Sequence, residues 1–158
     1  MTMDKLWAPW RINYIRYAKK KSPCIFCDSQ KDFVVFRTPH CVCMLNLYPY
    51  NNGHLMVSPK RHIRDIAQLK ETEMLDLMKA LNKAKGLLDK VLKPDGYNIG
   101  ANLGRAGGAG ITGHLHLHIV PRWVGDSNFM SITGSTRVIS QSLKDLYKRL
   151  KNAESKTN

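Results

Sequence analysis

The 158-residue chain has no apolar run near the roughly 18 to 20 residues that a membrane-spanning helix requires. Its first residues mix Lys, Arg, Asp and Trp, where a secretory signal peptide has a continuous apolar segment. Internal repeats and low-complexity tracts are also missing. These absences argue against a membrane, secreted or repeat protein, and we expect one cytoplasmic domain.

Acidic residues are scarce. The 12 Asp and Glu residues stand against 25 Lys and Arg residues, which leaves a formal net charge of +13. A surplus of this size predicts an anionic partner, and charge alone leaves nucleic acid, a membrane surface and a phosphorylated small molecule open.

Cysteine is limited to four positions, Cys24, Cys27, Cys41 and Cys43. Structural disulfides are not expected in a reducing compartment. Cys24-x-x-Cys27 is half of a zinc site and needs two more ligands. Cys41 and Cys43 alternate with Val42, which favours the interior of a strand.

Hydrophobic periodicity predicts five strands and two helices. The strands are expected at residues 33–36, 41–45, 54–57, 97–102 and 114–120. The helices are expected at 72–92, with an apolar stripe of Leu75, Met78, Leu81, Leu88 and Val91, and at 142–151. We therefore expect an α+β fold, a five-stranded antiparallel sheet with one long and one C-terminal helix. Residues 1–151 form the single domain, including an N-terminal arm at 1–30, and 152–158 form a polar tail.

The most informative segment is the predicted strand from His114 to Val120. His114, His116 and His118 alternate with Leu115, Leu117 and Ile119, so three imidazoles share one face and the apolar residues share the other. An imidazole row can bind phosphate oxygens, attack phosphorus or ligate a metal.

A glycine-rich loop leads directly into this strand. Five glycines lie between Gly104 and Gly113, so backbone N–H groups can approach an anion closely. The combination favours a phosphate cradle beside a nucleophile.

With these residues in view, the chain resembles the histidine triad (HIT) family, whose signature alternates three histidines with apolar residues. His114 to Val120 matches all seven signature positions. Asn46 with Gly53-His54-Leu55 resembles the family's nucleoside segment, and Asn102 with the glycine loop resembles its phosphate segment. The remaining similarity is closest to the prokaryotic branch with dinucleoside polyphosphate hydrolases and phosphorylases, and it lies at residues 6–11, 24–27 and 121–129.

The resemblance implies a two-step nucleotidyl transfer. His116 attacks the α-phosphorus and forms a covalent nucleotidyl-histidine, which water or phosphate then resolves. His118 binds phosphate oxygens and His114 completes the triad. His116 must be neutral at its attacking nitrogen, so we expect its other nitrogen to donate to a backbone carbonyl.

The resemblance also implies binding residues. Asn46 matches a position that binds ribose hydroxyls, although an asparagine that caps a turn is the alternative. Asn102, Gly108 and Gly110 match the phosphate approach. Related hydrolases often carry Gln or Ser just before the triad, whereas this chain has Thr112, whose hydroxyl can serve instead.

Zinc-bearing relatives, including galactose-1-phosphate uridylyltransferases, imply the rest of the metal site. The matching ligands are Cys24, Cys27, His62 and His114, a closed and structural zinc site. Two buried thiols with His62 on the surface are the alternative.

Other activities stay open within the resemblance. A purine nucleoside phosphoramidase is the main alternative, and a nucleic-acid-binding or adenylated-DNA-end-processing protein is an alternative of another class. Relatives of the last kind carry a C-terminal zinc finger, and this chain has no cysteine after Cys43, so we do not expect a nucleic-acid partner. Homodimers joined at their sheet edges are common in the family and are expected here.

Overall fold

The computed structural model describes residues 24–28, 33–126, 139 and 141–156. Most of the expected N-terminal arm, including residues 6–11, and the segment around Phe129 lie outside these residues. The described strands form one antiparallel sheet in the order β1-β2-β3-β5-β4. They are β1 (Val34–Arg37), β2 (Cys41–Leu45), β3 (Leu55–Pro59), β4 (Gly96–Gly100) and β5 (Leu117–Arg122). The expected α+β fold with a five-stranded antiparallel sheet is confirmed.

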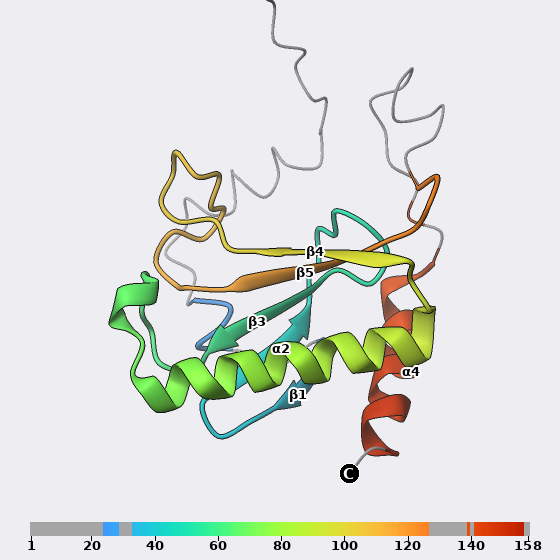
Figure 1. Ribbon diagram of the computed structural model, residues 1–158, viewed down its shortest axis with the longest axis horizontal. Coiled ribbons are helices and arrows are strands. Elements are labelled where there is room, and N and C mark those ends of the chain that lie inside the picture. The colour runs from blue at the N-terminus through green and yellow to red at the C-terminus, as the bar shows by residue number, and fades with distance from the viewer. Residues whose placement is uncertain (1–23, 29–32, 127–138, 140, 157–158) are drawn as a thin grey trace, which may run out of the picture.

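Two helices cover one face of the sheet. The long helix α2 (Glu71–Leu92) lies along this face, and α4 (Leu143–Ser155) packs against α2 and β1 (Figure 1). A single turn of 3-10 helix, η1 (Ile66–Gln68), precedes α2. No helix in the described part of the chain is both long and apolar enough to cross a membrane.

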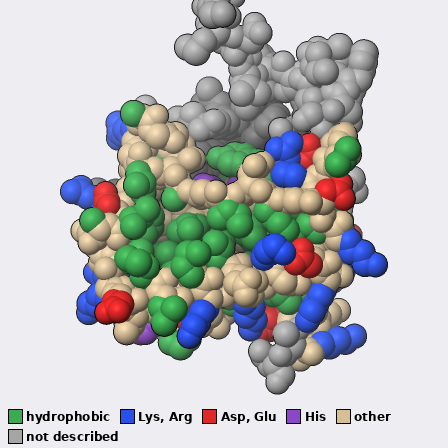
Figure 2. Space-filling model, viewed as in Figure 1, with side chains coloured by type: hydrophobic (Ala, Val, Ile, Leu, Met, Phe, Trp, Pro, Cys, Tyr) green, Lys and Arg blue, Asp and Glu red, His purple; other side chains and the backbone are tan. Residues whose placement is uncertain are grey.

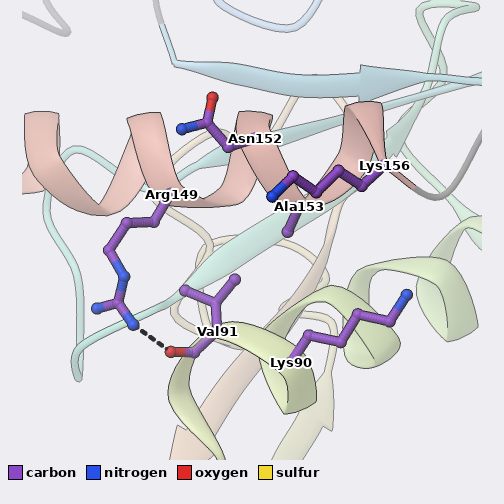
Figure 3. Close-up of a pocket in the computed structure, with 6 residues that line it drawn as sticks. All are labelled: Lys90, Val91, Arg149, Asn152, Ala153 and Lys156. Atoms are coloured by element: carbon purple, nitrogen blue, oxygen red, sulfur yellow. Dashed lines mark hydrogen bonds between the residues drawn. The ribbon is translucent and has the colours of Figure 1, made fainter.

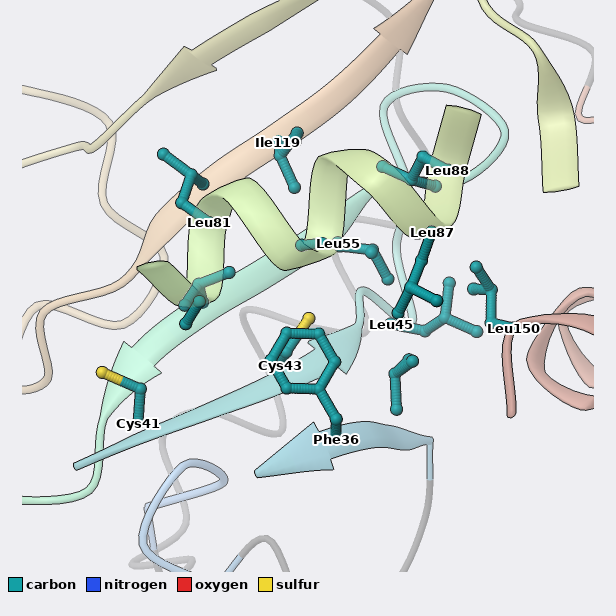
Figure 4. Packing of buried hydrophobic residues seen from close by; sticks show 14 of the residues in the cluster. Phe36, Cys41, Cys43, Leu45, Leu55, Leu81, Leu87, Leu88, Ile119 and Leu150 are labelled. Carbon is teal, nitrogen blue, oxygen red and sulfur yellow. The ribbon is translucent and has the colours of Figure 1, made fainter. Parts of the chain in front are cut away.

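The main core lies between the two helices and the sheet. Figure 4 shows side chains from α2 and α4 packed over those of β1, β2, β3 and β5. Its fully buried members include Leu45, Leu55, Leu88, Ile119 and Leu150. The thiols of Cys41 and Cys43 are buried in the same core, as expected for the interior of a strand.

The buried stripe of α2 differs from the expected one. Leu75 and Met78 are 58% and 55% exposed. The buried stripe is rotated around the helix relative to the expected one, and it again repeats every three to four residues. Its members are Leu77, Ala80, Leu81, Ala84, Leu87 and Leu88. Two alanines occupy this stripe because the helix lies close to the sheet. A periodicity counted over large apolar residues alone leaves these alanines out.

The ends of both helices are set by particular contacts. α2 ends at Leu92 because Lys93 has a left-handed backbone, with φ of 49°, and Pro94 follows. α4 continues to Ser155, so the expected end of this helix at residue 151 is wrong. Ala153 packs against the core and Glu154 pairs with Lys83 at 2.9 Å, which extends the helix by another turn.

The bounds of the two strands beside the histidines, β4 and β5, differ from the expected ones. β5 begins at Leu117 rather than His114, because Leu115 donates its N–H to the Ile63 carbonyl instead of to β3. β5 continues through Pro121 to Arg122, beyond the last residue paired with β3. β4 ends at Gly100, so Asn102 lies in the loop that follows.

The second face of the sheet is also covered. The segment Cys24–Asp28 forms a turn in which the N–H groups of Cys27 and Asp28 both donate to the Cys24 carbonyl. This turn places Phe26 against Met44 and Met56 in a second, smaller apolar cluster. The histidine face of the sheet is therefore largely buried, whereas alternation alone placed it opposite the core.

Gly53 supports the turn that leads into β3, and its replacement tests the packing between this turn and α2. Its φ is +79°, and an added Cβ would lie 2.4 Å from Leu92 Cδ1 and 3.0 Å from Pro121 Cγ. We expect Gly53→Ala to lower the free energy of unfolding by about 2 kcal/mol in urea denaturation, since it combines strain with crowding.

Gly86 provides the matched control. It lies within α2, and no heavy atom lies within 4 Å of its added Cβ. Gly86→Ala should raise the free energy of unfolding by about 0.5 to 1 kcal/mol. A Gly53→Ala protein as stable as the wild type would contradict the account of this turn.

Candidate active site and metal site

His116 is held in one tautomer by a backbone contact. The ring is buried, and its Nδ1 lies 2.8 Å from the carbonyl oxygen of His114. A carbonyl only accepts, so Nδ1 carries the proton and Nε2 keeps its lone pair. The expectation that the ring donates to a backbone carbonyl is confirmed, and Nε2 is the nitrogen with an available lone pair.

His118 lies beside His116 and is oriented by another histidine, His54. The rings of His116 and His118 have centroids 4.9 Å apart. His54 Nε2 lies 2.8 Å from His118 Nδ1, and His54 Nδ1 accepts the Tyr50 N–H at 3.0 Å. Because Nδ1 of neutral His54 is an acceptor, its Nε2 donates to His118, which leaves the proton of His118 on its own Nε2. The pair thus presents an N–H donor next to the lone pair of His116.

Burial keeps these rings neutral. Desolvation, followed by repulsion from His118 and then His116, lowers the pKa of His54 to about 3. Desolvation, followed by repulsion from His116, lowers the pKa of His118 to about 4. At neutral pH the two rings act through hydrogen bonds and carry no formal charge.

His54 is the site residue that sequence reasoning did not assign. It is fully buried on the turn before β3, beside the start of the strand that pairs with β5. The signal in the sequence is its place directly before the apolar run Leu55-Met56-Val57, within the segment Gly53-His54-Leu55 that resembles the family's nucleoside segment. That signal requires knowledge of the β3–β5 pairing before it points to His118.

Asn46 and the turn after it border the histidines. The Asn46 side-chain oxygen accepts the Tyr48 N–H at 2.9 Å, and its amide nitrogen lies 3.3 Å from His54 Nδ1. The Tyr50 ring lies 4.7 Å from the His54 ring and 5.7 Å from the His118 ring, between centroids. Asn46 therefore caps this turn, as the alternative interpretation expected, and the same contacts place its amide beside the buried histidine pair.

The glycine loop is organised by its own backbone. Gly104 and Gly108 have φ values of +69° and +83°, and Asn102 donates its amide N–H to the Gly108 carbonyl at 3.4 Å. Gly110 and Thr112 are exposed on the same loop. The loop joins β4 to the histidine segment, and Gly100 at its start pairs with His118. Its two ends are thereby connected to the histidines.

Four metal-ligating side chains meet at the other end of the histidine row. One ligand atom from each of Cys24, Cys27, His62 and His114 lies within 4.8 Å of the others. Nδ1 of His114 lies 3.2 Å from Cys24 Sγ and 3.5 Å from Cys27 Sγ, and Nδ1 of His62 lies 3.2 Å from Cys27 Sγ. These separations are near the edge lengths of about 3.5 Å that a tetrahedral zinc site would have.

The surroundings of the cluster suit a metal. His114 Nε2 donates to the Pro59 carbonyl at 2.8 Å, so its Nδ1 lone pair points toward the thiols. Arg61, next to His62, pairs with Glu73 at 2.6 Å and lowers the pKa of that carboxyl group to about 2. This ion pair ties the segment that carries His62 to the start of α2.

A separate cleft lies on the helical side of the sheet. It has a volume of about 400 Å³ between the last turns of α2 and α4, and Arg149 closes one side by donating to the Val91 carbonyl (Figure 3). Lys90 and Lys156 also line it. The histidines lie on the opposite face of the sheet, so this cleft is not part of their site.

Comparisons with known proteins show which family and fold the chain is similar to. The protein-family model described as HIT domain matches residues 28–124. An AP-4-A phosphorylase of Mycobacterium tuberculosis is 39% identical over 156 residues, which cover 90% of this chain and 80% of the relative.

Two solved structures have the same fold. A hypothetical histidine triad nucleotide-binding protein from Sulfolobus tokodaii has a TM-score of 0.68 and 26% identity, over 84% of this chain and 93% of its own. A Zn-bound histidine triad family protein from Mycobacterium smegmatis has a TM-score of 0.68 and 23% identity, over 85% and 94%. With the family model, the buried histidine row and these neighbours in agreement, the chain belongs to the histidine triad (HIT) family.

Proposed function

We propose that this protein cleaves dinucleoside polyphosphates such as diadenosine tetraphosphate through a covalent nucleotidyl-histidine on His116. The observation that carries the proposal is the hydrogen bond from His116 Nδ1 to the His114 carbonyl, because it leaves Nε2 unprotonated in a buried site. The name of the mycobacterial relative, AP-4-A phosphorylase, supports this substrate class.

The reaction proceeds in two displacements. His116 Nε2 forms a bond to the α-phosphorus, and the bond from that phosphorus to the bridging oxygen breaks, which releases ATP from diadenosine tetraphosphate. An oxygen of water or phosphate then attacks the same phosphorus and breaks the P–N bond. Water gives AMP and phosphate gives ADP.

The neighbouring groups assist by binding. His118 donates its Nε2–H to a phosphate oxygen, and His54 keeps it in that tautomer. Backbone N–H groups of the loop with Gly108 and Gly110 bind further phosphate oxygens, together with Asn102 and the Thr112 hydroxyl. The Asn46 amide binds the ribose hydroxyls. The histidines carry no formal charge and so do not attract the anionic substrate from a distance. The net charge of +13 on the whole chain provides that attraction.

Product analysis with diadenosine tetraphosphate, with and without inorganic phosphate, tests the function. We expect AMP and ATP without phosphate, or ADP and ATP with it, because both outcomes require the nucleotidyl-histidine. No products, combined with cleavage of adenosine phosphoramidate, would assign the protein as a phosphoramidase. Salt-dependent retention on DNA with neither turnover would favour the nucleic-acid alternative.

Replacement of the nucleophile tests the covalent step. His116→Ala should lower turnover on the order of 10³-fold or more while AMP still binds, because the nucleophile is lost and the ribose and phosphate contacts remain. The measurements are single-turnover rates and the dissociation constant of AMP. Unchanged turnover would remove the covalent mechanism.

We propose that the cluster of Cys24, Cys27, His62 and His114 holds a structural zinc ion. Two thiols and two imidazoles form a donor set that suits zinc, and the hydrogen bond to Pro59 orients Nδ1 of His114 toward the thiols. When bound, zinc supplies a fixed cross-link between the Cys24–Asp28 turn and the histidine segment. Reduced thiols are also what the cytoplasm maintains, and we place the protein there.

Removal of one ligand tests the metal. Cys24→Ser should reduce the metal content from one zinc per chain and lower the melting temperature, because the cross-link is lost. The measurements are metal analysis by mass spectrometry and thermal denaturation. Cys41→Ala is the control: this thiol lies in the core, so stability should fall while zinc stays bound. A wild-type protein that contains no zinc after purification, and that binds none when zinc is added back, would exclude the site.

We propose that two copies pair through β4 into a homodimer. β4 pairs with β5 alone among the described strands, so its outer edge can extend an antiparallel sheet. Ile99 on β4 is 48% exposed, and Met74, Leu75 and Met78 are exposed on the neighbouring α2. Figure 2 shows hydrophobic side chains gathered on this face of the molecule. A second copy related by a twofold axis would cover the edge and the apolar surface together.

A charge in this surface tests the dimer. Ile99→Lys should convert a dimer to a monomer in sedimentation velocity experiments, because each interface would bury two unpaired ammonium groups. Val124→Lys adds the same charge at a residue that is 92% exposed and lies outside the proposed dimer surface. This variant should leave the dimer intact. A monomeric wild type at micromolar concentration would contradict this proposal.

A further inference from the structure

The cysteine turn and the nucleophile touch through Phe26. This residue lies between Cys24 and Cys27 and is 2% exposed. Its ring stacks on His116 with centroids 4.9 Å apart and an interplanar angle of 28°, and it lies 5.2 Å from the ring of His114. The turn that supplies two of the proposed metal ligands therefore also supplies one wall of the nucleophile's pocket.

His114 makes the second connection. Its Nδ1 faces the two thiols, its Nε2 donates to the Pro59 carbonyl, and its own carbonyl accepts from His116 Nδ1. One residue thus joins the metal cluster to the hydrogen bond that sets the tautomer of the nucleophile. A movement of the His114 backbone would move the acceptor of that hydrogen bond.

We propose that the metal site positions the nucleophile, and that Phe26 is the positioning residue that transmits its effect. With the four ligands bound, Phe26 stays packed on one face of the His116 ring while the His114 carbonyl stays at Nδ1. This inference rests on the proposed function for the role of His116 as nucleophile. It goes beyond that function because it assigns the cysteine turn to catalytic geometry as well as to stability.

The physical reason lies in the contacts that hold the turn among the described residues. Within Cys24–Asp28 the backbone hydrogen bonds are local, since both end at the Cys24 carbonyl. Beyond the ligand side chains, the described contacts that anchor the turn to the sheet are those of the apolar cluster of Phe26, Met44 and Met56, against which Val34 and Ile111 also pack. A metal would join the same turn to His62 and His114, and this removes the freedom of Phe26 to leave the imidazole. An imidazole free to rotate spends less time aligned with the phosphorus.

Variants of Phe26 test the link on the full-length, zinc-loaded protein. Phe26→Ala should lower the single-turnover rate of nucleotidyl-histidine formation by roughly 10- to 100-fold, with the zinc content unchanged and the dissociation constant of AMP within about twofold. Phe26→Leu should restore part of the rate, because it refills the space without the flat stacking surface. A wild-type rate in Phe26→Ala would overturn the proposal.

Ile25→Ala is the matched control, since Ile25 lies between the same two cysteines but is 41% exposed. This variant should keep the wild-type rate and zinc content. An equal loss of rate in Ile25→Ala and Phe26→Ala would also overturn the proposal, because it would reflect a general disturbance of the turn.

Nuclear magnetic resonance of the imidazole nitrogens tests the coupling without turnover. The His116 Nδ1–H resonance should be present in the zinc-loaded protein and should broaden or disappear after chelation and in Cys24→Ser, with far-ultraviolet circular dichroism confirming a folded sheet. A resonance that is unchanged after chelation would overturn the proposal. A metal-dependent resonance in a protein that forms no nucleotidyl-histidine would support the coupling and refute the proposed function, so the two failures are distinguishable.

Discussion

The hydrogen bonds of His114 connect the separate parts of this site. Its ring donates to Pro59 at the end of β3, its second ring nitrogen faces Cys24 and Cys27, and its carbonyl accepts from His116. Because the ring donates to Pro59, its remaining lone pair is directed at the thiols. Because its carbonyl accepts from His116 Nδ1, the lone pair on His116 Nε2 is directed away from that carbonyl. One residue thereby couples the third strand, the cysteine turn and the His116 imidazole.

Desolvation explains why the buried histidines of this site are neutral. Burial, followed by repulsion from neighbouring histidines, lowers the pKa of His54 to about 3 and of His118 to about 4, so both rings are neutral at neutral pH. A neutral imidazole offers one lone pair and one N–H, and the partner on one nitrogen determines which group the other presents. The chain from Tyr50 through His54 to His118 uses this rule twice. In the proposed reaction, the loop N–H groups and the net positive charge attract the polyphosphate.

The sheet separates stability from chemistry on its two faces. On one face α2 and α4 bury leucines, alanines and the thiols of Cys41 and Cys43 in the main core. On the other face the cysteine turn covers Met44 and Met56 and encloses the histidines. The strands between them are buried on both sides, and all five residues of β2 and of β3 are buried. This double burial is why the buried polar side chains of His54, just before β3, and Ser58, within it, are both hydrogen-bonded.

The sequence by itself determined the strand and helix order, the α+β class, and the alternation that places His116 and His118 on one face, because these follow from local periodicity. Only the tertiary structure revealed that His54 orients His118, that Phe26 covers His116, and that the histidine face is buried. These contacts join residues 64 and 90 positions apart along the chain, and no local pattern encodes such a distance. The ends of β5 and α4, and the buried stripe of α2, also depended on packing partners that periodicity does not contain.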